Sequence, residues 1–331
     1  MIRVAVLGAG RIGRIHAANV AANPRATLVA VADPIAEAAT SLASRLGCES
    51  STSSAALIAR DDVDAVVIGT PSDTHLALML LAAEHGKAML CEKPIADDLA
   101  AADVAIAELE RMGARVMLAF NRRFDPANIA IRAAIDGGQV GDVRQVLITS
   151  RDPGLPPRDY LLHSGGIFRD MVIHDFDTAR FFLGEEPAEL FATASRLVDP
   201  ELMAAVDDSD TVTVVLRTAA GRQALITCCR EAVYGYDQRV EVFGSAGMIQ
   251  NDNLRPSTIR RSDATATDAR EPLLAFFLER YADAYRNEMD AFLAALESAG
   301  PMPTSPHDGR QALALADAAA ESARTGRSIQ V

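Results

Sequence analysis

A glycine-rich segment near the N-terminus constrains the fold most. In "IRVAVLGAGRIG", residues 2–13, a short apolar run leads directly into Gly8, Gly10 and Gly13, which have GxGxxG spacing. In such a segment the first glycine permits a tight turn, the second lets a pyrophosphate approach the backbone, and the third allows the following helix to pack closely. The helix N-terminus attracts phosphate groups. The segment therefore predicts a strand, turn and helix that bind a dinucleotide; the glycines alone would also fit a bare turn.

An acidic residue at the end of the next apolar run strengthens this interpretation. Asp33 follows Gly13 by 20 residues, the distance expected for a carboxylate that binds the adenosine ribose hydroxyls. Such a carboxylate repels a 2′-phosphate, and the Pro and Ile that follow it supply no cation. We therefore expect NAD rather than NADP, although Arg11 or Arg14 could still reach a phosphate. Ile12 completes the expected cofactor loop.

Residues 1–120 alternate short, β-branched, apolar runs with longer Ala-rich segments of helical period. Apolar strands that alternate with helices predict a parallel sheet covered on both faces, hence a doubly wound (Rossmann) α/β domain. Asp97 is the expected N-cap of the last of its helices. The expected strands are "IRVAVL", "TLVAVA", "DAVVIG", "AMLCE" and "RVMLAF", and the expected helices are 11–23, 35–47, 53–60, 74–86 and 98–113.

The pattern changes in residues 121–331, which predict a second, α+β domain with a large, mostly antiparallel open sheet. We expect helices over 273–298 and 308–325 and a mobile loop over 262–272. One side of "TVTVVLRT" carries Val215 among threonines, so the second face of the sheet is only half polar, and homo-oligomerisation through it is expected. The expected strands are "DVRQVLITS", "ELFATAS", "DTVTVVLRT", "RQALITCCR" and "QRVEVFG".

Length and composition exclude several classes of protein. A chain of 331 residues favours two domains, and a net charge of −13 without a basic stripe argues against nucleic acids and polyanionic substrates. We expect a cytoplasmic protein, since the sequence shows neither a signal peptide nor a membrane-spanning stretch. The four cysteines lack ligand spacing, so no metal site is expected.

A helical segment, "GGIFRDMVIHDFD" at 165–177, carries an unusual polar line. At about 100° per residue, Asp170, His174 and Asp177 fall within roughly 60° of one another, while apolar residues fill the rest of the circumference. The polar line should therefore face a cleft or the interior rather than open water, where buried polar groups need partners. A helix-surface pair of Asp170 and His174 is the alternative.

A lysine follows the expected strand "AMLCE", in "CEKPI". Ligands of doubly wound sheets bind at the carboxyl ends of the strands, which makes Lys93 a candidate for substrate and cofactor contact. Glu92 before it is a possible partner, and Pro94 after it fixes an extended bend. A solvated charge is the alternative for a lysine at such a place.

Together these motifs resemble the glucose-fructose oxidoreductase and inositol dehydrogenase (Gfo/Idh/MocA) superfamily. The stretches "AFNRRFDP" and "RDMVIHDFD" narrow the resemblance to inositol 2-dehydrogenases, and it covers essentially the whole chain. It implies an NAD-dependent oxidation of a cyclic polyol in inositol catabolism, with myo-inositol converted to 2-keto-myo-inositol (scyllo-inosose) as the default. It also implies a homotetramer.

The resemblance and the residues agree on a mechanism. An imidazole is suited to general-base catalysis near neutral pH, so His174 is the expected base, oriented by Asp170. Lys93 would hold the reacting hydroxyl. The histidines without such neighbours, His16, His85, His163 and His307, are expected to have no catalytic role. His75 is different, because the resemblance places its loop, with Thr70 and Pro71, beside the nicotinamide as possible cofactor contacts.

A polyol needs charged or amide groups around it. Residues at matching places in inositol dehydrogenases line the sugar pocket, although a structural role is as probable for any one of them. Some relatives carry His and Asn where this chain has Ser150 and Asp152, which leaves the isomer open among myo-, scyllo- and chiro-inositol or a pyranose. A non-catalytic NAD-binding regulator and an oxidoreductase of another ring substrate remain as alternatives. The expected substrate-binding residues are Lys93, Arg123, Asp152, His174, Asp177, Tyr234 and Tyr236, with Asp237 beside them.

Overall fold

The computed structural model describes residues 1–331 as two compact units. The first comprises Met1–Phe124 and Ala284–Leu313, and the second comprises Asp125–Asp283 and Ala314–Val331. The expected division into 1–120 and 121–331 therefore differs from these units for residues 121–124 and, more substantially, for residues 284–313. Residues 284–313 join the first unit because α11, Ala282–Ser298, buries Met289, Phe292 and Leu293 in its core.

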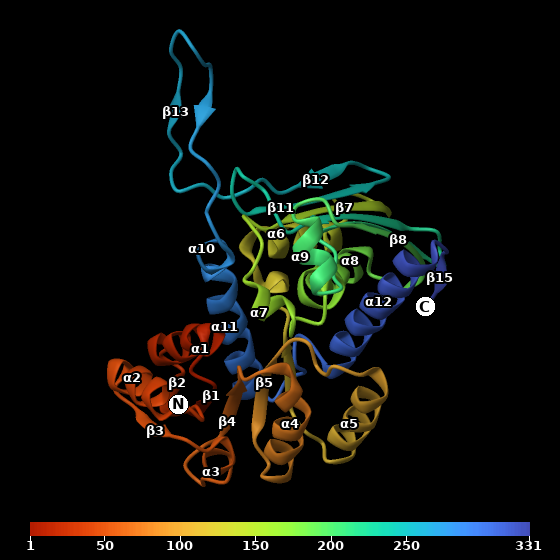
Figure 1. Ribbon diagram of the computed structural model, residues 1–331. Helices are drawn as coiled ribbons and strands as arrows, with labels where there is room; N and C mark the ends of the chain where they lie inside the picture. The colour runs from red at the N-terminus through yellow and green to blue at the C-terminus, as the bar shows by residue number, and fades with distance from the viewer. The chain divides into compact units, whose positions relative to one another are not determined.

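The first unit is a parallel six-stranded sheet with the order β3-β2-β1-β4-β5-β6; the apolar runs predicted five of these strands and missed the short β3. The strand order reverses between β1 and β4, which is the place where such sheets bind ligands. Asp98, not Asp97, caps α5, because its side chain accepts a hydrogen bond from Ala101 N at 2.8 Å. The strands are β1 Ile2–Leu7, β2 Ala26–Ala32, β3 Glu49–Ser51, β4 Ala65–Ile68, β5 Ala88–Glu92 and β6 Val116–Ala119. The helices (Figure 1) are α1 Arg11–Ala22, α2 Ala36–Leu46, α3 Ser54–Ile58, α4 His75–Glu84 and α5 Leu99–Arg111, with short 3-10 turns at Ser72–Thr74 and Asn121–Phe124.

The second unit is built on a seven-stranded sheet with the order β12-β11-β7-β10-β9-β8-β15. β7 and β10 pair in parallel and the other neighbours pair antiparallel, so the sheet is mixed and mostly antiparallel. The strands are β7 Val143–Arg151, β8 Pro187–Ser195, β9 Thr211–Thr218, β10 Gln223–Cys229, β11 Asp237–Gly244, β12 Met248–Gln250 and β15 Ile329–Gln330. The helices are α6 Pro126–Asp136, α7 Arg158–Leu161, α8 Ile173–Leu183, α9 Pro200–Ala205, α10 Phe277–Arg280 and α12 Pro306–Thr325, whose first turns lie in the other unit.

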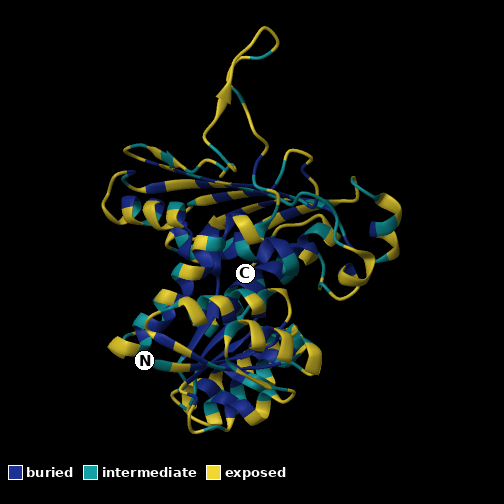
Figure 2. Ribbon diagram, turned by 90° about the vertical axis from the view of Figure 1, so that its left-hand side faces the viewer, coloured by how far each residue is buried: buried dark blue, intermediate teal, exposed yellow.

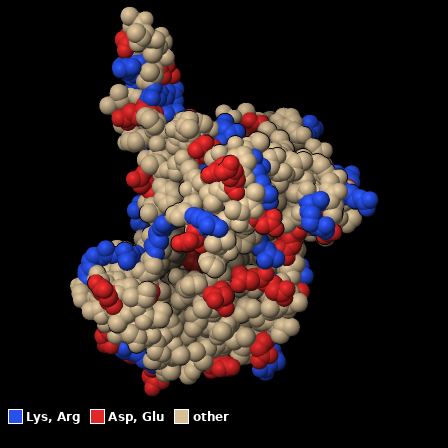
Figure 3. Space-filling view, viewed as in Figure 1, with Lys and Arg blue, Asp and Glu red and all other residues tan.

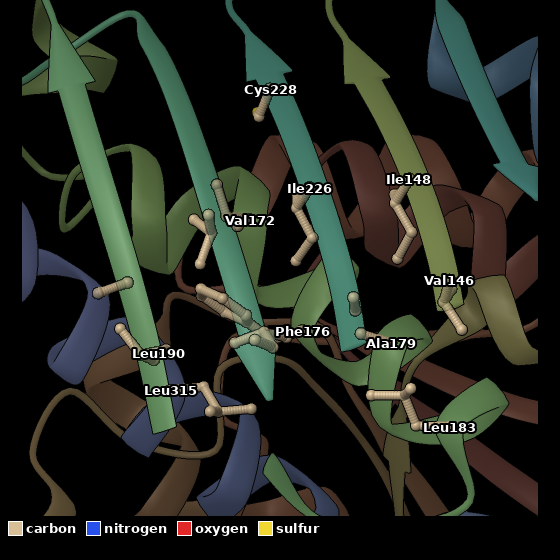
Figure 4. Close-up of a cluster of buried hydrophobic side chains, with 14 of the residues drawn as sticks. Val146, Ile148, Val172, Phe176, Ala179, Leu183, Leu190, Ile226, Cys228 and Leu315 are labelled. Atoms are coloured by element: carbon tan, nitrogen blue, oxygen red, sulfur yellow. The ribbon is translucent and has the colours of Figure 1, made fainter. Parts of the chain in front are cut away.

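Helices cover one face of this sheet. α8 packs the fully buried Phe176 against inward side chains of the strands such as Ile148 and Ile226 (Figure 4). Phe182 of α8, also fully buried, belongs to the same core. Leu315 of α12 lies in the same core. This packing fixes the position of α8 and of the residues that precede it.

The opposite face of the sheet carries a row of apolar side chains. Phe191, Val215, Leu225 and Leu147 are direct lateral neighbours on β8, β9, β10 and β7, and each is between 37 and 42% exposed. Figure 2 shows the alternation of buried and exposed residues along these strands, as predicted for β9. We call these four residues the apolar row.

The loop expected at 262–272 lies mostly at the end of a hairpin arm, although Ala269–Arg270 within it forms a strand. β13, Arg260–Arg261, pairs with β14, Ala269–Arg270, and the arm projects from the rest of its unit (Figure 1). Figure 3 shows side chains of both signs on it, in agreement with the ion pair between Arg270 and Asp268. In place of the single helix expected over 273–298, the structure has the short α10 followed by α11. None of the helices is long and apolar enough to span a bilayer.

Candidate active site

The three glycines of the first loop have different tasks. Gly8 has φ +100°, and a Cβ on it would lie 2.5 Å from the carbonyl oxygen of Gly69 at the end of β4. A Cβ on Gly13 would lie 1.9 Å from the Gly8 carbonyl oxygen. A Cβ on Gly10 would meet no protein atom within 4 Å, so its backbone is open on the side where a pyrophosphate would approach. The loop fits a dinucleotide.

Asp33 is fixed against this loop. Its carboxylate accepts hydrogen bonds from Ala9 N at 2.8 Å and from Ile35 N at 2.9 Å. Arg14, one of the two arginines that could have met a 2′-phosphate, instead donates from Nε to Ala9 O at 2.9 Å. The end of β2 therefore presents a carboxylate, as expected for an NAD site.

His75 connects the loops that follow β4 and β5. Its Nδ1 lies 2.8 Å from Pro94 O and its Nε2 lies 3.0 Å from Thr70 O, and the residue is buried. Both ring nitrogens are thus engaged with the backbone, and His75 holds the two loops together. The Lys93-Pro94 peptide, in the loop that follows β5, is cis.

Glu92 has a partner that the sequence did not indicate. Nε2 of His16, a residue expected to be ordinary, lies 2.7 Å from Glu92 Oε1. His16 is fully buried, whereas the Glu92 side chain is 12% exposed. The available signal was the position of His16 three residues after Gly13, on the face of α1 that packs inward. Lys93, the next residue in the chain, is half-buried.

In the second unit, the helix that carries the polar line is not regular. Phe168–Val172 forms a π-helical turn that leads into α8. Such turns are rare and frequently mark functional sites. Asp170 lies on this turn and His174 on the first turn of α8, both partly exposed. Asp177 differs from them: it is fully buried and lies 3.4 Å from Arg180 Nη1, which gives it a structural partner.

Asp170 is held by two residues that sequence reasoning missed. Tyr160 donates from its hydroxyl to Oδ1 at 2.7 Å, and Arg230 donates from Nη1 to Oδ2 at 3.0 Å. Arg230, which is fully buried, also donates from Nη2 to Asp208 at 3.1 Å. Asp208 in turn accepts from Ile167 N at 2.9 Å, at the start of the π-helical segment. We call this set the Arg230 network. The sequence feature that could have indicated Arg230 is its position four residues before "YGYD", a segment already considered for substrate binding.

The network has clear electrostatic consequences. Burial lowers the pKa of Arg230, but the charges of Asp170 and Asp208 outweigh it, and the pKa lies above its ordinary value. Burial and the adjacent Asp170 charge raise the pKa of Tyr160 well above its usual range. Tyr160 therefore stays a proton donor to Asp170, and Arg230 stays a cation. Asp170 is a fixed carboxylate whose charge is balanced.

Two other residues expected to bind substrate, Arg123 and Tyr234, already have hydrogen-bond partners within the protein. Arg123 donates to Asp308 at 2.8 Å, within the first unit. Tyr234 donates to Asp237 at 2.8 Å and accepts from Arg151 at 2.6 Å. Burial raises the pKa of Asp237, but hydrogen bonds from Arg239, Tyr234 and Asn253 lower it more, so the net shift is downward.

Tyr236 and Asp152 differ in exposure. Tyr236 is buried, with its ring edge-on to Tyr281. Asp152 is partly buried just after β7. The second unit therefore keeps Asp152, Asp170 and His174 at least partly accessible, whereas Tyr236 is packed in the interior.

The fold and these motifs define a dinucleotide-dependent oxidoreductase. Residues 2–120 match the oxidoreductase family with an NAD-binding Rossmann fold, and residues 129–250 match the GFO/IDH/MocA C-terminal domain. The chain belongs to the GFO/IDH/MocA oxidoreductase family, and its first unit is an NAD-binding domain.

Relatives within this family are similar over the full length. The chain is 49% identical over 330 residues to an inositol 2-dehydrogenase of Rhizobium meliloti, covering all of this chain and 99% of the relative. It matches the structure of a myo-inositol dehydrogenase from Corynebacterium glutamicum with a TM-score of 0.97, at 44% identity over 100% and 99% of the two chains. A scyllo-inositol dehydrogenase from Lactobacillus casei, solved with NAD(H) and scyllo-inositol, matches with a TM-score of 0.93 at 26% identity, over 100% and 99%.

The glycine loop gives a matched pair of variants. Gly10→Ala should fold normally and lose NAD affinity, because its methyl group meets no protein atom but occupies the side where the pyrophosphate approaches. Gly13→Ala should lower both NAD affinity and the unfolding temperature, because its methyl group meets the Gly8 carbonyl. Thermal unfolding and titration calorimetry with NAD check both. Equal unfolding temperatures for the two variants would contradict these assignments.

Loss of the Arg230 network should be costly. Arg230→Met leaves the buried Asp208 and the partly exposed Asp170 without their cation, and we expect a loss of about 3–5 kcal/mol in the unfolding free energy of this unit, together with reduced turnover. Urea denaturation and steady-state kinetics measure the two effects. Arg217→Met removes an exposed ion pair of β9 and serves as the control, with a nearly unchanged midpoint. If both variants unfold alike, Arg230 does not hold this site together.

Proposed function

We propose that this protein is an NAD-dependent inositol 2-dehydrogenase that oxidises myo-inositol to scyllo-inosose. One observation carries the proposal: an intact NAD loop occurs together with an Asp170 that is anchored by Arg230 and a His174 one turn later. The chain that contains both is 49% identical over its full length to an inositol 2-dehydrogenase. The L. casei relative was solved with both NAD(H) and an inositol, which supports this class of substrate.

The strand order supports an orientation for the cofactor. Asp33 at the end of β2 would bind the adenosine ribose, and the glycine loop after β1 would bind the pyrophosphate. The nicotinamide half then extends toward β4 and β5, on the other side of the switch point. Thr70, Pro71, Glu92 and Lys93 follow those two strands and are the residues proposed to contact it. NAD bound by these residues would supply the acceptor for the hydride of the substrate carbon.

The protein's own groups handle the proton. His174 takes the hydroxyl proton of the substrate as general base, and Asp170 orients its ring and stabilises the imidazolium. The Arg230 network fixes Asp170 for this task. The Lys93 ammonium donates to the substrate oxygen and stabilises its developing negative charge. Arg123, Asp152 and Tyr234 are the proposed contacts to the other hydroxyls.

Initial rates of NAD reduction test this proposal. The purified protein is assayed with myo-, scyllo- and chiro-inositol and with glucose. The highest kcat/KM should be for myo-inositol; a higher value for another isomer would change the substrate but keep the reaction. NAD binding without turnover of any of them would overturn the enzyme assignment in favour of a regulator.

His174→Ala should lose most turnover and leave the NAD dissociation constant nearly unchanged. A general base contributes typically 10²–10⁴-fold to the rate, and we expect a loss on that order in kcat. Stopped-flow rates and NAD titration separate the two quantities. His163→Ala, an exposed histidine of the same unit, is the control. A parallel loss of NAD affinity in His174→Ala would argue against a role confined to proton transfer.

We also propose that the apolar row joins copies of this chain, in a homotetramer. Its four side chains, Phe191, Val215, Leu225 and Leu147, cross four adjacent strands on a sheet face that no helix covers. Contiguous exposed apolar surface of this kind marks protein interfaces.

Val215→Glu should dissociate the oligomer, because the new carboxylates would be buried without partners at the centre of the interface. Light scattering after gel filtration gives the molar mass. Val104→Glu, at a 73% exposed position on α5, should leave the mass unchanged. A wild-type protein that is monomeric at micromolar concentration would refute this assembly without bearing on the reaction.

A further inference from the structure

A buried cluster of titratable residues lies at the end of β5, and only one of its members, Glu92, has a place in the proposed reaction. Its members are His16 of α1, Glu92 of β5 and Glu288 of α11, all in the first unit. His16 and Glu288 are fully buried, whereas the Glu92 side chain is 12% exposed. Only Glu92 therefore reaches the surface of the unit from this cluster.

The imidazole and the outer carboxylate are in direct contact. His16 Nε2 lies 2.7 Å from Glu92 Oε1, so a proton on Nε2 is donated to the Glu92 carboxylate. Tyr285, one turn before Glu288 on α11, packs edge-on against the His16 ring, with the centroids 5.8 Å apart. The ring of His16 is thus fixed by its neighbours, and it fixes the position of the Glu92 carboxylate in turn.

Glu288 is a carboxyl group without a cation or donor. Both of its oxygens are buried and accept no hydrogen bond from the protein. An ionised carboxylate in such a place is strongly unfavourable, and a second one beside Glu92 is more so. Burial and the nearby Glu92 charge raise the pKa of Glu288 well above its ordinary value. Burial without a donor or a cation therefore favours the neutral acid form of Glu288, which adds no second negative charge beside Glu92.

The position of Glu92 gives this charge a function. Glu92 ends β5 at the carboxyl edge of the sheet, on the side of the switch point proposed for the nicotinamide half of NAD. The oxidised nicotinamide ring carries a positive charge and the reduced ring carries none. A carboxylate held near the ring therefore attracts the oxidised form more strongly.

We propose that His16 and Glu288 are positioning residues that keep one negative charge on Glu92, and that this charge makes the site prefer oxidised over reduced NAD. The inference rests on the proposed NAD site. It assigns a cofactor preference suited to an enzyme that oxidises an alcohol, since it favours binding of NAD⁺ and release of NADH. A neutral Glu288 adds no second negative charge beside Glu92.

Separate dissociation constants for NAD⁺ and NADH test this, measured by calorimetry on the full-length protein. Glu92→Gln and His16→Leu should each lower the affinity for NAD⁺ relative to NADH by about tenfold. The first substitution removes the negative charge, and the second removes the imidazole that holds the Glu92 carboxylate in position. His16→Gln keeps a neutral N–H donor at the end of its side chain and should restore most of the preference. An equal loss of both affinities in His16→Leu, or no recovery in His16→Gln, would overturn the assignment.

The chain contains a matched control. His307 and Glu110 form a His–Glu pair with the same 2.7 Å separation in the same unit, but their side chains are 60 and 63% exposed. His307→Leu should leave the preference for NAD⁺ unchanged. Wild-type protein that binds neither form of NAD would refute the proposed function itself. Normal binding and turnover with no change of preference in Glu92→Gln would refute only this inference.

Infrared difference spectroscopy tests the state of Glu288 directly. The spectrum of the wild-type protein minus that of Glu288→Gln, recorded at mildly alkaline pH, should contain the carbonyl stretching band of a protonated carboxylic acid. A difference spectrum with carboxylate bands in its place would show Glu288 to be ionised and would overturn the single-charge arrangement.

Discussion

Buried charge must be balanced inside the protein, and this requirement organises the chemistry of both units. In the second unit, Arg230 lies between Asp170 and Asp208, so that one cation fixes the carboxylate proposed to orient the base. In the first unit, His16 holds Glu92, while burial and the Glu92 charge raise the pKa of Glu288. Each arrangement leaves one carboxylate partly accessible and gives it a defined position. Substituting Arg230 or His16, which are both buried, would therefore change the position of a carboxylate that is accessible from outside.

The two sheets use their faces and edges in different ways. The parallel sheet is covered on both faces, so its chemistry gathers at the carboxyl ends of its strands, where the glycine loop, Asp33, Thr70 and Glu92 lie. The mixed sheet has one free face, and the apolar row lies there. The cofactor site and the proposed assembly surface therefore belong to separate units.

The sequence predicted what depends on local pattern. Glycine spacing identified the loop, apolar runs identified five strands of each sheet but not the short β3, β12 and β15, and the motif around His174 identified the family. What it missed are contacts between residues far apart in the chain. His16 and Glu92 are separated by 76 positions, and Asp170 and Arg230 by 60. The π-helical turn was missed because the 100° rule assumes a regular helix.

The discontinuous first unit has a consequence for synthesis of the chain. Its parallel sheet is complete once β6 has left the ribosome, but part of its core, including Phe292 and Leu293, is supplied by α11 about 170 residues later. Until then the nascent domain exposes apolar surface that only the end of its own polypeptide can cover. A fragment excised at residue 120 would retain that exposed surface permanently, so transplanting this nucleotide-binding module into a chimera requires carrying both pieces together.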